Sequence, residues 1–305
     1  MEPSDRTASL MTPAKLAQVA AARAPVSPAA YLDRMASDVG HQHVQQLLAL
    51  CRTLQAGAQA SQAAGVQPLL QELPPLLKAI DFDLLQQRGW LAGLTGKART
   101  AGAEFAAQVR RADQAADALA ESVAAVTKAQ QPHAAAAERA LLDLEVEYKA
   151  LDKIIDQGAR WLQDMRNQLK TRVAIDADSQ RQIDEDTARC ELLVGRLKAL
   201  RAAASASQDA LAAVRTTAER RAAFARELRQ LLAEDLEAWQ ARLAGAAAAA
   251  AEGRLDSDPA PLKDGTKALR RRLKQVQADC EQLATHEAQL QDKLQSMADL
   301  LGAAA

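Results

Sequence analysis

The stretch LLDLEVEYKALDKIIDQGARWLQDMRNQL, residues 141–169, indicates the architecture of this chain most clearly. Its seam residues recur at alternating steps of three and four, the spacing that lines up one face of an α-helix as a coiled-coil seam. The series is Leu141, Leu144, Tyr148, Leu151, Ile155, Gly158, Leu162, Met165 and Leu169. Such a stripe must be covered by another helix, so the pattern predicts helix–helix packing.

Similar apolar series extend over residues 105–126, 183–239 and 269–301, and Glu287 is the one charged member of the last series. Aromatic residues make up 3% of the chain, and much of its 49% hydrophobic fraction is alanine. Alanine favours helices but buries little area, which suits thin helix–helix seams. We therefore expect an all-α fold, an elongated antiparallel bundle of long, coiled-coil-like helices.

Prolines and loop residues divide the chain into segments. Residues 1–30 contain four prolines and are predicted to be a disordered N-terminal arm. Residues 31–97 are predicted to form a region of short helices, because Pro68, Pro74 and Pro75 should prevent one continuous helix near 63–97. Residues 98–305 should form the long-helix bundle, with Pro132 as a kink or a helix start and a linker at about 245–261.

Charge and cysteine content narrow the class of protein. The net charge of −1 gives no overall attraction to nucleic acid or an anionic membrane. Cys51, Cys190 and Cys280 are far apart and odd in number, so we expect reduced thiols in a cytoplasmic protein. We find no signal-peptide pattern and no apolar run long enough to span a membrane. Peripheral attachment to the inner membrane stays open.

Motifs for catalysis, cofactor binding and metal binding are missing from the sequence. The acidic groups 184–186 and 234–237 lack histidine partners for a metal site, and we interpret them as solvated faces. The cysteines fall on apolar faces, where packing is expected rather than reactivity. The run RRRLK, residues 270–274, has no interleaved aromatic residues, so we do not expect nucleic-acid binding. The expectation is a non-enzymatic protein without cofactor or metal.

One segment concentrates bulky residues in a chain that has few of them. The candidate contacts for a partner or a membrane surface are Phe82, Leu85, Trp90, Leu91 and Leu94, within residues 76–94. Basic residues nearby would favour an anionic membrane surface, whereas Asp81 and Asp83 would oppose it. The alternative is that this segment packs as a short helical cap over the end of the bundle.

Gly158 occupies a seam position where a large apolar residue is expected, and Trp161 follows it. Glycine inside a helix costs about 1 kcal/mol relative to alanine, so an offsetting contact is expected. We predict a helix crossing here, with a neighbouring backbone close to Gly158 and the Trp161 ring beside the seam.

The order of three segments resembles the TelA-like family of toxic anion resistance proteins. They are GLTGKARTAGAEFAAQVRRADQAADALAESVAAV, ERALLDLEVEYKALDKIIDQGARWLQDM and CELLVGRLKALRAAASASQDAL, within a similarity that covers roughly residues 75–300. The matching positions are Leu151, Ile155, Gly158, Gly195, Arg196, Leu197 and Leu200. The resemblance implies a cytoplasmic helical protein linked to resistance to tellurite and to envelope stress, and it supplies no catalytic residues.

The expected function is therefore that of a non-enzymatic helical protein acting through a protein partner or self-association in toxic anion resistance. One alternative is a coiled-coil structural scaffold or a membrane-associated remodelling protein. Another is a redox enzyme that uses the cysteines on oxyanions. The pattern leaves the oligomeric state open, because intramolecular bundles and intermolecular coiled coils share the same seams.

Overall fold

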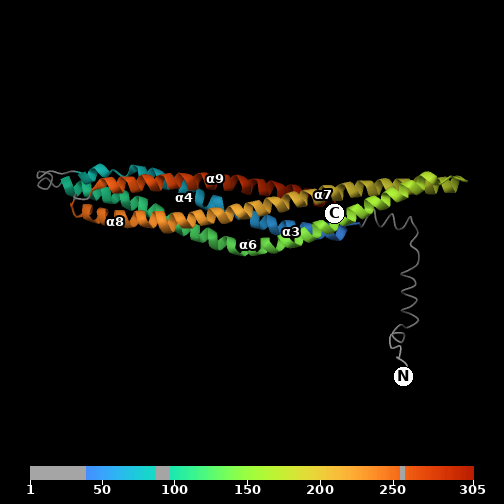
Figure 1. Ribbon diagram of the computed structural model, residues 1–305, viewed down its shortest axis with the longest axis horizontal. Helices are drawn as coiled ribbons and strands as arrows, with labels where there is room; N and C mark the ends of the chain where they lie inside the picture. The colour runs from blue at the N-terminus through green and yellow to red at the C-terminus, as the bar shows by residue number, and fades with distance from the viewer. Residues whose placement is uncertain (1–38, 87–96, 255–257) are drawn as a thin grey trace, which may run out of the picture. The chain divides into compact units, whose positions relative to one another are not determined.

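A computed structural model describes residues 39–86, 97–254 and 258–305 (Figure 1). Its elements are α3 (His41–Gln59), α4 (Gln62–Ala79), the 3₁₀-helix η2 (Phe82–Gln86), α6 (Lys97–Thr171), α7 (Ala177–Gln230), the π-helix η3 (Leu231–Leu236), α8 (Glu237–Ala251) and α9 (Pro259–Ala303). All regular structure in these ranges is helical, so the all-α prediction is confirmed. None of these helices has an apolar stretch long enough to cross a bilayer. The predicted arm, residues 1–30, lies outside the described ranges.

The contacts divide the chain into two compact units. Unit 1 comprises Met1–Leu47, Val146–Ser205 and Leu300–Ala305, of which residues 1–38 are not described. Unit 2 comprises Leu48–Glu145 and Ala206–Asp299. Each unit has its own buried apolar residues.

In unit 1, the second part of α6 and the first part of α7 pack side by side in opposite directions as a helical hairpin (Figure 1). The predicted seam lies inside this pair, with Leu151 and Ile155 of α6 and Leu193 and Leu200 of α7 all at most 1% exposed. Arg166 of α6 pairs with Glu191 of α7 at 2.6 Å. The steps of three and four in the sequence therefore mark the buried face, as predicted.

The hairpin of unit 1 also holds the start of α3 and the end of the chain. Arg196 donates through Nε to the Val39 carbonyl oxygen at 3.3 Å and through Nη1 to the Ala304 carbonyl oxygen. His43 Nδ1 lies 2.6 Å from Glu147 Oε2. Gly40, just before α3, has a φ of 76°, a left-handed conformation that side chains disfavour. One arginine thus links two chain segments that are distant in sequence.

Unit 2 packs α4, α6, the α7–α8 helix and α9 against one another, each adjacent pair antiparallel (Figure 1). Its core contains Leu70, Phe105, Leu119 and Leu273, each fully buried. Polar side chains join neighbouring helices around this core. The clearest is the indole Nε1 of Trp239 in α8, which donates to Thr266 Oγ1 of α9 at 3.1 Å.

The expectation of short, proline-broken helices before residue 80 is wrong for α4, which continues through Pro68, Pro74 and Pro75. Proline lacks an N–H, so Pro74 leaves the carbonyl of Leu70, four residues earlier, without its helical donor. The side chain of Gln277 in α9 fills this role, because its Nε2 donates to the Leu70 carbonyl oxygen at 2.7 Å. Tertiary contact thus compensates for the hydrogen bond that proline removes.

The seam predicted for the third long helix is only partly right after Val214: Leu228 and Trp239 are buried as predicted, but other members are not. The series expected Ala218 and Leu232 on the seam, but Ala218 is exposed and Leu232 half-buried. The residues that turn inward are Thr217, Phe224, Leu228, Leu231, Leu236 and Trp239. The step of five between Leu231 and Leu236 does not fit an α-helical face, and η3 absorbs it because a π-turn hydrogen-bonds i to i+5.

The alanine-rich tract at 245–251 is helical, although it was expected to belong to a linker. α8 continues to Ala251, since alanine has the highest helix propensity. Gly253, with φ of 81°, ends it: Gly253 N donates to the Ala250 carbonyl and Arg254 N to that of Ala249, as in a Schellman motif. α9 begins at Pro259, where Asp258 Oδ1 accepts from Ala260 N at 3.0 Å.

Candidate functional site

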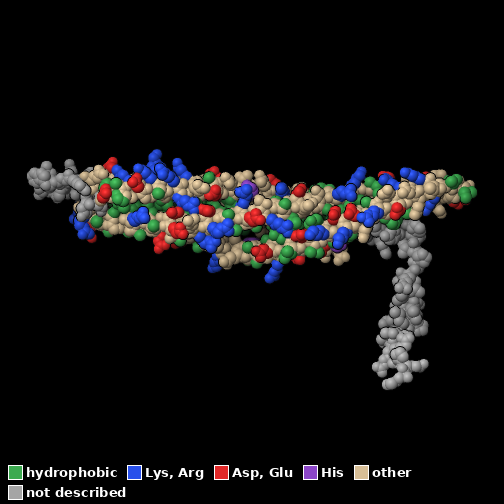
Figure 2. Space-filling view, in the orientation of Figure 1, with side chains coloured by type: hydrophobic (Ala, Val, Ile, Leu, Met, Phe, Trp, Pro, Cys, Tyr) green, Lys and Arg blue, Asp and Glu red, His purple; other side chains and the backbone are tan. Residues whose placement is uncertain are grey.

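The loop that closes the hairpin of unit 1 exposes two β-branched apolar side chains. Val173 is 80% exposed and Ile175 is 92% exposed, in the segment between Thr171 at the end of α6 and Ala177 at the start of α7. Figure 2 shows hydrophobic side chains gathered at this end of the hairpin. We call Arg172–Asp176 the hairpin tip.

Ion pairs and a helix cap hold the hairpin tip in place. Arg172 Nη1 lies 2.7 Å from Asp186 Oδ2, and Arg189 Nη1 lies 3.1 Å from Asp186 Oδ1. Asp176 caps α7 by accepting from Ser179 N at 2.7 Å, and hydrogen bonds from the Ser179 side chain and backbone hold the pKa of Asp176 below its ordinary value. The tip is therefore anchored on both sides by side-chain contacts.

Asp186 departs from the sequence interpretation of a solvated acidic face. It is 7% exposed and is held by two arginines, whereas Asp184 and Glu185 are exposed as expected. In the second acidic group, Asp235 lies 3.4 Å from Arg272 Nε. Within the described ranges, no three His, Cys, Asp or Glu side chains gather as they would around a metal ion.

The bulky segment is described only in part. Phe82 and Leu85 lie in η2 and are buried in the core of unit 2, at 6% and 1% exposure. Phe82 contacts Phe105 of α6 edge to face, with ring centroids 5.8 Å apart. These two side chains thus pack against the bundle rather than facing solvent. Trp90, Leu91 and Leu94 lie outside the described residues.

Gly158 is buried on the α6 seam, but its close neighbour is a side chain and not a backbone. A Cβ atom on Gly158 would lie 2.8 Å from Cδ2 of Leu197 in α7. Trp161 is half-buried one turn further along α6. The glycine therefore makes room for Leu197, while the predicted backbone approach occurs elsewhere, at Gly102.

The three cysteines are free and buried, at 0–1% exposure. Cys51 Sγ donates to the Leu294 carbonyl oxygen at 3.3 Å, and Cys280 Sγ to that of Ala63 at 3.6 Å. Burial raises the pKa of Cys51 to about 11 and that of Cys280 to about 12. A high pKa keeps the thiol protonated, and the neutral thiol is a poor nucleophile.

Glu287, the charged member of the α9 seam, is the centre of a buried polar network in unit 2. It is 2% exposed and accepts from Arg221 Nε at 2.7 Å, from Gln62 N at 3.2 Å and from Ser61 Oγ. Arg221 also reaches the carbonyl oxygens of Gly57 and Ala60. The sequence marks Glu287 as an anomaly, but its partners come from two distant segments, residues 61–62 and Arg221, which only the folded chain brings to it.

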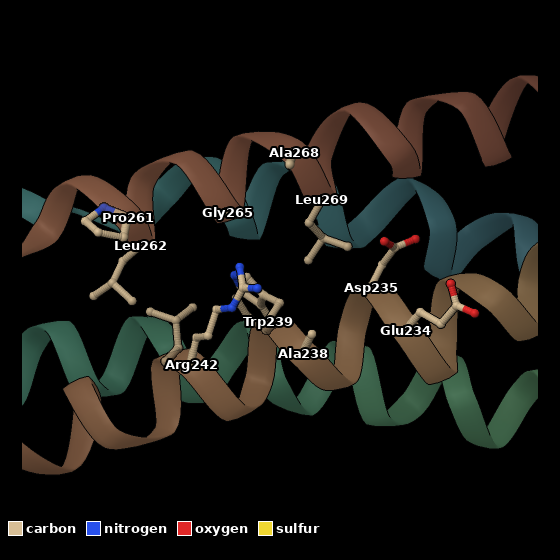
Figure 3. Close-up of a pocket in the computed structure, with 11 residues that line it drawn as sticks. Glu234, Asp235, Ala238, Trp239, Arg242, Pro261, Leu262, Gly265, Ala268 and Leu269 are labelled. Carbon is tan, nitrogen blue, oxygen red and sulfur yellow. The ribbon is translucent and has the colours of Figure 1, made fainter.

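A second feature missed by the sequence is a pocket of about 260 Å³ beside η3 (Figure 3). Figure 3 shows Trp239 and Arg242 extending from α8 towards α9, with Glu234 and Asp235 on the neighbouring π-turn. The Trp239 ring is held by its bond to Thr266, and Asp235 by Arg272. These contacts give Trp239 and Asp235 structural roles.

Basic residues gather on one face of α9 in unit 2. Lys267, Arg270, Arg271 and Lys274 line a shallow hollow, and Figure 2 shows Lys and Arg side chains standing out from this part of the molecule. Leu269 and Leu273 beside them are buried in the seam. The basic residues of the run RRRLK thus lie beside the buried seam of α9.

We compared the chain with family models, curated proteins and solved structures, and none of them matches it.

Proposed function

We propose that this protein is a non-enzymatic, cytoplasmic helical adaptor that binds a protein partner through the hairpin tip and acts in resistance to toxic anions such as tellurite. The observation that carries the proposal is the exposure of Val173 and Ile175 at 80% and 92%. Apolar side chains held in water at a fixed position are what the core of a protein interface requires.

The way the tip is mounted supports a role in binding. Arg172 is paired with Asp186, and Asp176 caps α7, so the two apolar side chains between them are presented by an anchored loop. A partner would lose little loop entropy on binding such a preorganised segment. The tip therefore has both the chemistry and the rigidity of a docking point.

The toxic anion context rests on the resemblance to TelA-like proteins, and most residues that carry it belong to the core of unit 1. Leu151, Ile155, Leu197 and Leu200 are buried in the hairpin, and Arg196 anchors two chain segments to it. The seven matching positions thus lie in the unit that carries the tip, although the similarity also extends over unit 2. Their shared location in unit 1 supports one function for the matching residues and the hairpin tip.

Complementation of tellurite tolerance tests the proposal. A strain lacking this protein should regain tolerance with the wild-type chain but not with Val173→Asp/Ile175→Asp. Leu142→Glu, at a position 66% exposed in unit 2, is the control and should restore tolerance. A photo-crosslinking amino acid placed at residue 173 should capture the same protein partner in two kinds of cells: those with the otherwise wild-type chain and those with the Leu142→Glu chain. Full tolerance with the double tip variant would contradict the proposal.

The alternative of a membrane-remodelling protein uses the same tip, since Val173 and Ile175 could also enter a bilayer. Asp176 and Asp178 follow directly and are exposed, which disfavours an anionic surface. Flotation with anionic liposomes separates the two: the adaptor stays at the bottom of the gradient, and tip-dependent flotation would favour remodelling instead. Sedimentation velocity over a range of concentrations tests self-association.

A further inference from the structure

A cavity of about 320 Å³ lies within unit 2, beside the Glu287 network. Its walls come from α3, α4, α6, α7 and α9. The cavity exists because α6 buries no residue between Val123 and Ala140, a stretch that includes Pro132. Alanines at 134, 137 and 218 face it, and their small side chains leave the space unfilled.

The lining is apolar over most of its surface and polar at one end. Leu54, Leu141, Val214 and Leu290 join the alanines as apolar wall, while Gln62 and Arg221 mark the polar end. The Arg221 guanidinium is 2.7 Å from the Glu287 carboxylate and also bonds two backbone carbonyls. These two charges neutralise each other, and the other carboxylate of the lining, Glu138, is exposed to solvent, so the cavity favours an uncharged occupant.

Gln62, one of the residues that line the cavity, carries an unsatisfied hydrogen-bond acceptor. The residue is 4% exposed, and its side-chain oxygen Oε1 has no hydrogen-bond partner among the described residues. The backbone N–H of Gln62 donates to Glu287 Oε1 at 3.2 Å. This hydrogen bond holds Gln62 beside the Glu287 network. A buried amide oxygen without a donor is energetically costly, and a donor arriving with a ligand would remove that cost.

We propose that this cavity binds a small, uncharged amphipathic molecule, with an apolar body against the alanine and leucine walls and one N–H or O–H donor directed to Gln62 Oε1. The volume lies at the lower end of the range for small-molecule sites. Binding of this kind is independent of the hairpin tip, because the tip belongs to unit 1 and the cavity to unit 2.

The probe for the test is N-phenyl-1-naphthylamine, an uncharged aromatic amine with a single N–H donor whose fluorescence rises in apolar surroundings. Titration of the full chain should show one saturable site. Ala137→Leu, which fills the cavity from α6, should abolish that site, and Ala218→Leu should do the same from α7. Ala136→Leu, an exposed neighbour outside the lining, is the matched control and should bind as the wild type does.

The hydrogen bond from the ligand to Gln62 is tested with Gln62→Met. This substitution keeps the length of the side chain and removes the oxygen atom Oε1. Affinity for N-phenyl-1-naphthylamine should fall about tenfold, equivalent to about 1.4 kcal/mol. The N-methylated analogue, which lacks the donor, should bind wild type and Gln62→Met alike. Circular dichroism melting confirms that each variant is folded. No saturable site in the wild type, or unchanged binding by both cavity-filling variants, would overturn the proposal.

Discussion

Gly102 of α6 lies directly against the backbone of Ala250 in α8, with no room for a side chain between the two helices. A Cβ atom on Gly102 would overlap the Ala250 carbonyl oxygen and lie 2.6 Å from its carbonyl carbon. Backbone atoms cannot swing aside as a side-chain tip can. This pair is therefore a tight crossing of the kind that the sequence suggested at Gly158.

Gly102→Ala should destabilise unit 2 even though alanine is the better helix former. We expect the free energy of unfolding to fall by about 1–3 kcal/mol, the usual cost of overpacking, measured by urea denaturation. Gly245→Ala is the control, because a Cβ there meets nothing within 4 Å. It should stabilise by about 0.5–1 kcal/mol. Equal effects at the two positions would contradict the tight crossing.

Substitutions at Gly158 should follow a different order, because the obstacle is the flexible side chain of Leu197 at 2.8 Å. Gly158→Ala should change the melting temperature little, since Leu197 can shift. Gly158→Leu needs far more volume in the closed seam and should cost about 1–3 kcal/mol. Gly195→Ala, where a Cβ meets open space, serves as the reference. Identical melting temperatures for the two Gly158 variants would refute this account.

Glu287→Ala should be strongly destabilising, because it leaves the mostly buried Arg221 guanidinium without its carboxylate. Loss of one partner of a buried pair costs about 3–5 kcal/mol. The double variant Arg221→Met/Glu287→Leu removes both charges and should recover most of that loss in urea denaturation. If the double variant is as unstable as Glu287→Ala, the ion pair is not the source of the effect.

The side chain of Gln277 should stabilise the fold only because Pro74 leaves the Leu70 carbonyl without a helical donor. Gln277→Leu is expected to cost about 1–3 kcal/mol, the penalty for a buried unsatisfied acceptor. In the Pro74→Ala background the helix supplies its own N–H, so the same substitution should cost much less. A double-mutant cycle measures this coupling, and additive effects would exclude it.

The buried thiols should make stability fall at high pH. Burial raises the pKa of Cys51 to about 11 and of Cys280 to about 12, from an ordinary value of 9.0. The unfolded chain ionises first, so the stabilising contribution is complete below pH 9.0 and is lost as the pH rises towards these values. The variant Cys51→Ala/Cys280→Ala should show a shallower loss between pH 9 and 10.5, measured by urea denaturation.

The same pKa shifts predict slow thiol labelling. With a chromogenic aromatic disulfide at pH 8, the native chain should react far more slowly than the urea-unfolded chain. Rapid labelling of all three cysteines in the native protein would overturn the packing role and favour the redox alternative.

The helical class and the inner faces of α6 and α9 follow from residue spacing. Every predicted α9 seam residue from Leu269 to Leu301 is buried, and so is Glu287. The prediction succeeds here because an α-helix with a regular seam has one inward face, whatever covers it. Between Leu231 and Leu236 the buried face changes register through a π-turn, which the predicted series with Leu232 on the seam did not include.

The continuity of α4, the cavity and the tight crossing have a different origin. Local rules correctly say that Pro74 removes a hydrogen bond, but they do not contain Gln277, more than two hundred positions away in α9. In the sequence, Gly102 and Gly158 are both glycines inside a helical pattern. Only the packing of the neighbouring helices shows that Gly102 lies against a backbone and Gly158 against a side chain. Likewise, Glu287 stands out in the sequence, whereas Arg221, Ser61 and Gln62 join it only after folding. Helical class and buried faces depend on near neighbours along the chain, which periodicity records. Sites depend on which distant segments meet, and periodicity carries no information about that.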